Sequence, residues 1–182
     1  MQDRGSPLVH TPVEGHHFRQ VCSRFACGIT IATVLDANGN SHGMTASSFT
    51  SVSLVPPMVL ICVDSRSKIL EHFRQSAHFG INILSQNDRS LSEKFAGRMY
   101  DRFEGVEWFA GKSGVPLLPG VLATIECARV NVVPAGDHEI LLGEVLHAHC
   151  QDGEPLIHYG SQYRFLGQTS TLDSRSATAG NE

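Results

Sequence analysis

Short apolar blocks alternate with turn-forming polar clusters along most of this chain, and the apolar blocks are rich in β-branched residues. Blocks of this length, bounded by Gly, Pro, Asn and Asp, are typical of β-strands. The pattern predicts strands at residues 29–35, 42–46, 58–64, 78–84, 121–133, 138–150, 156–159 and 163–166. Because MVLICVD at 58–64 is almost unbroken apolar chain, we expect that strand to be buried on both faces.

Two connections between these strands carry hairpin signals. The segment DANGN, residues 36–40, contains the Asn-Gly pair that two-residue hairpin turns favour. The segment PAGD separates the two longest strands and places Gly136 at the tip of a second hairpin. Both signals predict that neighbouring strands pair antiparallel.

A first helix is predicted near the N-terminus. Phe18, Val21, Cys22 and Phe25 follow the i, i+3, i+4, i+7 spacing of one helix face, and Gly28 is expected to end the helix.

Two further helices are predicted between the strands. The segment SRSKILEHFRQS places its apolar residues on one helical face, and NDRSLSEKFAG forms a short helix that ends at Gly97. The expected N-cap residues are Ser65 or Ser67 for the first helix, and Asn87 or Asp88 for the second.

Many strands, few helices and no regular strand–helix alternation favour a mainly β fold. We expect a closed or nearly closed antiparallel barrel with helices on its outside, and a doubly wound sheet is the weaker alternative. Closure removes the strand edges that would otherwise be exposed. The 182 residues are expected to form one domain at 15–168, between flexible tails at 1–14 and 169–182.

The composition is that of an ordinary globular protein with a mild acidic excess. Lys and Arg number 14 against 18 Asp and Glu, for a net charge of −4, which argues against a nucleic-acid or membrane partner. No apolar stretch approaches the roughly 18 residues of a membrane span, and no secretory signal is visible, so a cytoplasmic location is expected. The five cysteines are scattered without a C-x-x-C pair, which is typical of reduced thiols.

The segment HGMTASSFTSVS precedes the apolar strand and is rich in hydroxyl groups. Ser47 or Ser48 as a nucleophile would need an oriented His and an acid, and no G-x-S-x-G turn surrounds them. The hydroxyls either cap backbone groups of a loop or line a ligand site. Small residues beside donors suit a flat heterocycle with carbonyl and ring-nitrogen acceptors.

An anion site is predicted directly after the apolar strand. A helix that begins within VDSRSKIL would present free backbone N–H groups, with serine hydroxyls and the charges of Arg66 and Lys68 beside them. Alone this signal is weak, but after a donor-rich loop it indicates a phosphate-binding segment.

Three other motifs fail. GVEWFAGKSG has five residues instead of four between its first Gly and the Gly-Lys pair, so it is no P-loop, and G-x-G-x-x-G is absent. In HAHC, His147 and His149 would share one strand face, but two ligands are too few for a metal site. We therefore expect no metal.

Taken together, several segments resemble the flavin reductase-like family, the short-chain NAD(P)H:flavin oxidoreductases that serve two-component monooxygenases. The Thr-Ala-Ser-Ser run and the Gly-Asp-His triplet are specific in combination, and the resemblance runs in order from about Phe18 to Leu166. The segments that carry it are GITIATVLDANGNSHGMTASSFTSVSLVPPMVLICVDSRSKI, HFGINILS, LSEKFAG, DRFEGVEW, GVPLLPGVLATIECARV, GDHEILLGEVL and PLIHY.

The resemblance implies an FMN-binding split β-barrel, a homodimer with its sites near the subunit interface, and particular flavin contacts. Thr45, Ala46, Ser47 and Ser48 would line the isoalloxazine and ribityl chain. Cys62, Val63 and Asp64 would follow along the flavin, and Ser67 with Lys68 or Arg66 would meet its phosphate.

Four more positions follow from the same resemblance. His138, in the Gly-Asp-His triplet, would lie where the nicotinamide stacks on the flavin. Phe79 and Asn82 match an F-x-x-N strand, where a structural role fits equally well. The family often has Tyr-Arg-Gly-x-Tyr near its C-terminus; this chain has YGSQY without the arginine, and Tyr163 is the candidate cofactor contact there.

The implied activity is hydride transfer from NADH or NADPH to FMN or FAD, which then leaves as reduced flavin for a separate monooxygenase. Two alternatives stay open: an FMN-retaining oxidase of related barrel fold, and a flavin carrier or redox sensor without turnover.

Overall fold

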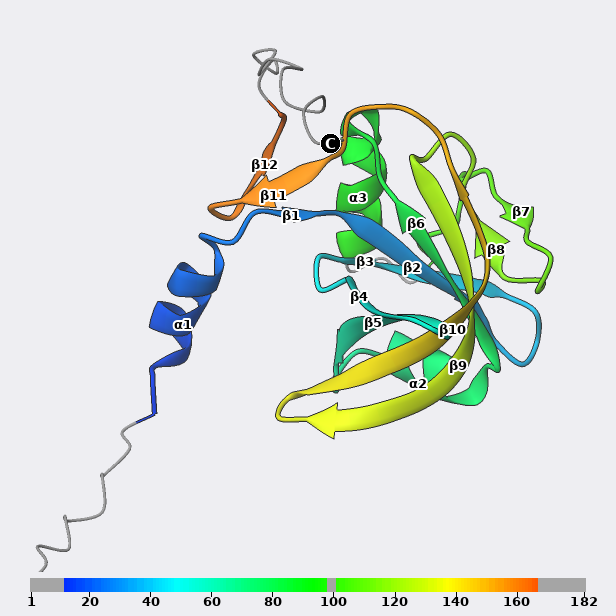
Figure 1. Cartoon of the computed structure of the whole chain (residues 1–182), viewed down its shortest axis with the longest axis horizontal. Helices are drawn as coiled ribbons and strands as arrows, with labels where there is room; N and C mark the ends of the chain where they lie inside the picture. Colours follow the sequence, from blue (N-terminus) through cyan, green and yellow to red (C-terminus); the bar gives the residue numbers. More distant parts are fainter. Residues whose placement is uncertain (1–11, 98–100, 167–182) are drawn as a thin grey trace, which may run out of the picture.

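A single antiparallel sheet of seven strands forms the body of the protein in the computed structural model, which describes residues 12–97 and 101–166 (Figure 1). Its strand order is β3-β2-β6-β9-β10-β5-β4. The strands are β2 (Thr30–Leu35), β3 (Ser41–Ala46), β4 (Thr50–Leu54), β5 (Pro57–Asp64), β6 (His78–Ile83), β9 (Ala123–Ala135) and β10 (His138–Cys150). The mainly β fold predicted from the sequence is confirmed.

The sheet curls so that its two edges approach each other. The edge strands β3 and β4 are consecutive in the chain, joined by residues 47–49, and β3 also contacts β5. Buried side chains of β2, β5, β6 and β10 meet Leu70 and Phe73 in the main core. A second core lies where Phe95 and Phe103 pack edge to face.

Both expected hairpins are present. In the turn after β2, the Asp36 carboxylate accepts hydrogen bonds from the backbone N–H groups of Asn38 and Asn40, and Gly39 has a φ of +82°. Between β9 and β10, Gly136 and Asp137 form a two-residue turn. The φ of +67° at Gly136 suits a glycine in the first central position of a type II′ turn.

Two small sheets complete the β structure. Strands β1 (Cys27–Gly28), β11 (Ile157–Tyr159) and β12 (Gln162–Arg164) form one, and β7 (Phe109–Ala110) and β8 (Pro116–Leu117) form the other.

The N-terminal helix α1 (Gly15–Cys22) is shorter than the apolar spacing predicts. It ends at Cys22, so Phe25 lies beyond it, and Gly28 belongs to β1 instead of stopping the helix. No residue of α1 is buried, and the helix extends away from the body of the molecule (Figure 1). Its apolar face therefore has no partner among the described residues.

The other two helices lie close to their expected places. Helix α2 (Ile69–Gln75) has Lys68 at its N-cap without a side-chain cap bond, so neither Ser65 nor Ser67 caps it. Helix α3 (Arg89–Ala96) has Asp88 at its N-cap and Gly97 at its C-cap, as predicted. A short 3₁₀ turn, η1 (Gln86–Asp88), precedes it, and its cap is Ser85.

Two strand predictions are wrong in detail. The polar segment before the apolar strand contains β4, a strand that was missed because the hydroxyl groups of this segment were interpreted as those of a loop or a ligand site. Strand β5 alternates between buried and partly exposed positions, so it is buried on one face only. The expected tails lie outside the described residues except for 12–14, and no described helix is long and apolar enough to cross a membrane.

Candidate flavin site

The Thr-Ala-Ser-Ser run lies at the end of β3 and in the loop that follows. Thr45 is partly buried, and its hydroxyl donates to the backbone carbonyl of Ser92 on α3, with an O···O distance of 2.6 Å. Ala46 is buried, whereas Ser47 is exposed. Of this run, the Ser47 side chain is therefore the one most open to a ligand.

The Ser48 side chain joins this loop to strand β5. Its hydroxyl accepts from the Cys62 N–H at 2.9 Å and donates to the Cys62 carbonyl at 3.2 Å. The β4–β5 pairing begins only at Thr50 opposite Leu60, so Cys62 lies just beyond the last paired residue. The Ser48 hydroxyl thus binds the two Cys62 backbone groups that a further residue of β4 would otherwise bind. The hydroxyl-rich segment and the apolar strand, which were predicted separately, meet at this point.

The alternation of β5 separates the three residues predicted to follow the flavin. Cys62 and Asp64 lie on the partly exposed face, but Val63 lies on the opposite face with 0% of its surface exposed. The Val63 side chain belongs to the main core. The Val63 side chain therefore points away from the partly exposed face, because successive residues of a strand point to opposite faces. A contact of Val63 with flavin stays a prediction, and it would have to use the backbone.

Asp64 and Arg66 form a bidentate ion pair at the end of β5. The guanidinium donates to both carboxylate oxygens, at 3.0 and 2.7 Å, and the Arg66 N–H donates at 2.8 Å. The bonds from the Arg66 side chain and backbone hold the pKa of Asp64 well below its usual range. Lys68 is exposed, and the described residues give it no ion pair. The segment 65–68 therefore presents two cations, one of them already held by a carboxylate.

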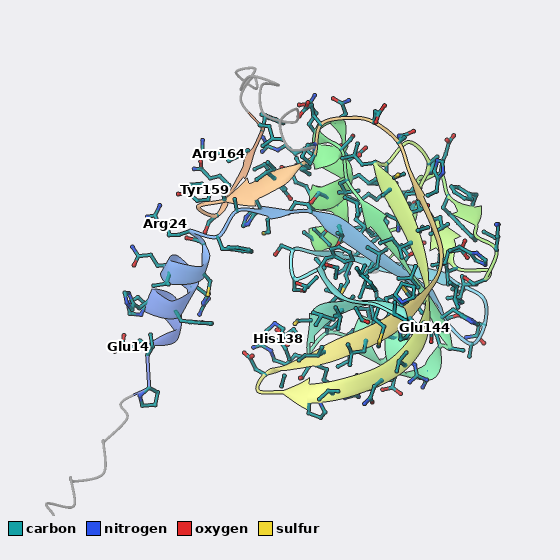
Figure 2. All side chains as sticks on the ribbon, viewed as in Figure 1. Glu14, Arg24, His138, Glu144, Tyr159 and Arg164 are labelled. Carbon is teal, nitrogen blue, oxygen red and sulfur yellow. The ribbon has the colours of Figure 1, made fainter. Side chains whose placement is uncertain are left out.

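His138 begins β10 directly opposite Asp64 in the β10–β5 pairing. Its Nδ1 lies 2.7 Å from an Asp137 carboxylate oxygen, and its side chain is 44% exposed. The Asp137 carbonyl accepts from the Ser65 N–H at 3.0 Å, which ties the hairpin tip to the 65–68 segment. Figure 2 shows His138 at that end of the long hairpin, away from Glu144.

Tyr163 is linked to the Thr-Ala-Ser-Ser run by a hydrogen bond to Ser92, a residue that the sequence analysis did not single out. Its hydroxyl lies 2.9 Å from the hydroxyl of Ser92, whose carbonyl accepts the Thr45 bond. The guanidinium of Arg89 lies 5.2 Å from the centre of the Tyr163 ring. Ser92 is fully buried and couples the hydroxyl run to the C-terminal hairpin. No local pattern marks it, since it is one serine among several in a helix.

Phe79 and Asn82 take the structural role that the sequence left open. Phe79 is 1% exposed and packs edge to face against Phe73 in the main core. The fully buried Asn82 amide donates to the Ile31 carbonyl at 3.0 Å and accepts from the Leu118 N–H at 2.8 Å. Their side chains face other protein groups, and the expectation that they bind the cofactor is corrected.

The structure therefore brings together eight of the predicted positions along one edge of the barrel. They are Ser47, Ser48, Cys62, Asp64, Arg66, Ser67, Lys68 and His138. Thr45, Ala46 and Tyr163 adjoin this edge, which we call the Ser48–His138 edge. A separate cavity of about 430 Å³ lies against β7 and the far end of β10, and it is lined by Glu126 and His147 among others. None of the predicted site residues lines it.

Comparison with known proteins assigns the family. The Flavin reductase like domain matches residues 22–167. An NADH-dependent flavin reductase of Rhodococcus sp. is 40% identical over 154 residues, which cover 82% of this chain and 85% of that protein. The reductase subunit HsaB of a flavin-dependent monooxygenase of Rhodococcus jostii (strain RHA1) is 34% identical over 88% of this chain and 82% of that protein.

The fold is also shared with solved structures and with a longer relative. The NADH:FAD oxidoreductase SgcE6 of Streptomyces globisporus C-1027, solved with NAD and FAD fragments, superposes with a TM-score of 0.81 at 34% identity. That match covers 85% of this chain and 94% of the other. A probable flavin reductase of Rhizobium meliloti (strain 1021) is 41% identical over 127 residues, but this chain spans only 41% of its length. The split-barrel fold is confirmed, and the chain belongs to the flavin reductase-like domain family.

Proposed function

We propose that this protein is an NADH-dependent flavin reductase, which reduces FMN or FAD and releases the reduced flavin to a separate monooxygenase. Membership of the family and the names of the relatives support the activity, the nicotinamide and the kind of partner. The single observation that carries the proposal is the Ser48–His138 edge. It joins a hydroxyl-bearing loop, two cations and an imidazole on adjacent strands.

The residues of this edge fit a flavin nucleotide. Ser47 offers an exposed hydroxyl to the ring or ribityl oxygens, and the partly exposed face of β5 presents Cys62 alongside. Lys68 and Arg66 supply positive charge for a phosphate. Arg66 has to share its donors between Asp64 and the phosphate, so Lys68 carries most of the attraction.

The nicotinamide and flavin supply the redox chemistry, a hydride that passes from nicotinamide C4 to flavin N5. The task of the chain is to hold the two rings face to face at reacting distance. With flavin bound, the exposed Ser47 hydroxyl would be the side-chain donor of the 45–48 run that is available to stabilise negative charge on the reduced ring. His138, oriented by Asp137, positions the nicotinamide carboxamide or ring, since hydride transfer itself needs no proton donor.

The direct test is oxidation of NADH and of NADPH by the purified protein with FMN, FAD or riboflavin added, followed by loss of nicotinamide absorbance. We expect turnover with NADH that saturates with added flavin, and protein that purifies nearly colourless. Turnover by a yellow protein without added flavin would support the flavin-retaining oxidase. No turnover with any pair would support a carrier or sensor and overturn the proposal.

A second copy of the chain is proposed to cover helix α1. Phe18, Val21 and Phe25 are 59%, 56% and 78% exposed, which is unusual for three neighbouring apolar side chains. The extension of α1 away from the body suits a contact with another subunit (Figure 1). Light scattering should give twice the chain mass, and Phe18→Glu with Val21→Glu should give the monomer mass.

A further inference from the structure

Three potential metal ligands meet where helix α2 packs against the β2–β3 hairpin, at a place that the proposed flavin chemistry does not use. They are Asp36 in the β2–β3 turn, His42 on β3 and His72 on α2. One ligand atom from each lies within 4.8 Å of the other two. The imidazole rings are stacked, with centroids 4.0 Å apart and planes inclined by 13°.

The turn holds the Asp36 carboxylate in place toward the histidines. Its Oδ1 accepts the N–H groups of Asn38 and Asn40, at 2.9 and 2.8 Å. Its Oδ2 accepts the Asn40 amide at 3.0 Å and lies 3.1 Å from His42 Nε2. Both oxygens therefore accept hydrogen bonds from the turn, and Oδ2 also faces His42.

The Asp36–His42 contact has the spacing of two ligands on one ion. Donor atoms 2.0–2.1 Å from a tetrahedral zinc ion are separated by about 3.3 Å. The observed 3.1 Å between Oδ2 and Nε2 is close to that value, so an ion can take the place of the shared proton. His72, whose ring is stacked on that of His42, then has to rotate out of the stack to bring a ring nitrogen to the same ion, and its side chain is only partly buried.

We propose that Asp36, His42 and His72 form a binding site for a divalent transition-metal ion of the zinc type. Two imidazoles and one carboxylate are a ligand set that such ions prefer over Mg²⁺ or Ca²⁺, which favour oxygen ligands. The fourth position is left to water. The site departs from the expectation of no metal, because residues 36, 42 and 72 have no motif spacing and only the fold brings them together.

The ion connects elements that also meet through the stacked rings of His42 and His72. Asp36 and His42 belong to the β2–β3 hairpin, and His72 belongs to the helix that follows the 65–68 segment. A ligand bridge between hairpin and helix stabilises the folded state, because the unfolded chain does not bring these three residues together. The site shares no residue with the Ser48–His138 edge, so it stands even if the proposed function is wrong.

The test uses full-length protein without a histidine tag, treated with a chelator and then dialysed. Titration with Co²⁺ should give one ion per chain, with the visible absorption typical of tetrahedral nitrogen and oxygen ligands. Zn²⁺ should displace the Co²⁺ and raise the melting temperature. The variants His72→Gln and His42→Gln should each weaken binding at least about tenfold, since even outer-shell changes cost 10- to 100-fold.

His149→Gln is the matched control, because His149 is an exposed histidine at the far end of β10. It should bind Co²⁺ like the unchanged protein. Equal melting temperatures of all variants without metal show that they are folded, and if one histidine variant fails to fold the other carries the test. Metal binding that survives both His42→Gln and His72→Gln, or that is lost in His149→Gln, overturns the proposal, as does no binding at micromolar Co²⁺.

Discussion

The hydroxyl of Ser48 binds both the N–H and the carbonyl of Cys62, at the point where the pairing of β4 with β5 has ended. One side chain therefore does the work of a strand residue and fixes the 47–49 loop against β5. The loop carries the hydroxyl of Ser47, which is proposed to contact flavin, and β5 leads to Asp64 and Arg66. The position of Ser48 thus couples barrel closure to the shape of the proposed site.

Ser48→Ala should lower both the free energy of unfolding and the affinity for flavin. Two backbone groups of Cys62 lose their partner, and each partly buried unpaired group costs about 1 kcal/mol or more. We expect a loss of about 2 kcal/mol in urea unfolding and a higher flavin Kd by fluorescence quenching. Ser51→Ala, at an exposed position of β4, is the control and should change neither. Unchanged stability of Ser48→Ala would remove Ser48 as a link of the barrel.

His138→Ala should slow turnover with NADH and leave flavin affinity nearly unchanged. The imidazole stands opposite Asp64 and is oriented by Asp137, and in the proposed arrangement it contacts the nicotinamide and not the flavin phosphate. A positioning role predicts a fall in kcat of about tenfold or more, since misplaced rings react slowly. Steady-state NADH oxidation and a flavin titration measure the two effects separately. His149→Ala, on the same strand, should behave like the unchanged protein, and an equal rate in His138→Ala would exclude His138 from the reaction.

Local sequence predicted most strands and the two hairpin pairings, β2 with β3 and β9 with β10, because β-branched blocks and turn glycines act over a few residues. The turn at Gly136 and the ends of α3 at Asp88 and Gly97 are examples. The predicted caps of α2, Ser65 and Ser67, are wrong: the helix begins at Ile69, where Ile69 and Leu70 are buried in the core.

Only two observations in the sequence pointed to the candidate site: the family resemblance and the number of hydroxyl donors in one segment. Which hydroxyls stay available depends on pairing across the barrel: Thr45 and Ser48 are held by Ser92 and Cys62. Residues 92 and 62 are far from them in sequence, so no local pattern gives these contacts. The same reason explains why Ser92, and the meeting of residues 36, 42 and 72, required the folded structure.

The Glu126 carboxylate, which binds residues 112 and 113, should make the free energy of unfolding depend on pH. Burial raises the pKa of Glu126, but hydrogen bonds from Ser113 and the Lys112 N–H lower it more, so the net shift is downward. A lowered folded pKa stabilises the protein above the ordinary pKa of Glu, and this stabilisation is lost as the pH falls through the folded value. Glu126→Gln should therefore cost about 2 kcal/mol at pH 7 and clearly less near pH 3, measured by urea unfolding.

The control for this pH effect is Glu144→Gln, which changes an exposed carboxylate on β10. It should leave the unfolding free energy unchanged at both pH values. A cost for Glu126→Gln that stays equal at both pH values would show that shape, and not the charge of Glu126, holds the 111–113 loop.

The rates at which the cysteines react with an alkylating reagent test the burial of Cys127 and the proposed subunit contact at Cys22. Burial raises the pKa of Cys127 to about 12, so almost none of it is thiolate at pH 8, and its sulfur lies in the main core. Cys150 is exposed at the end of β10, and Cys22 is exposed on α1. Brief treatment with iodoacetamide, followed by peptide mass spectrometry, should modify Cys150 and spare Cys127. Because a second copy is proposed to cover α1, Cys22 should react more slowly in the native protein than in the Phe18→Glu, Val21→Glu variant. Rapid modification of Cys127 would contradict the core described for β9, and equal rates at Cys22 in both proteins would place the subunit contact elsewhere.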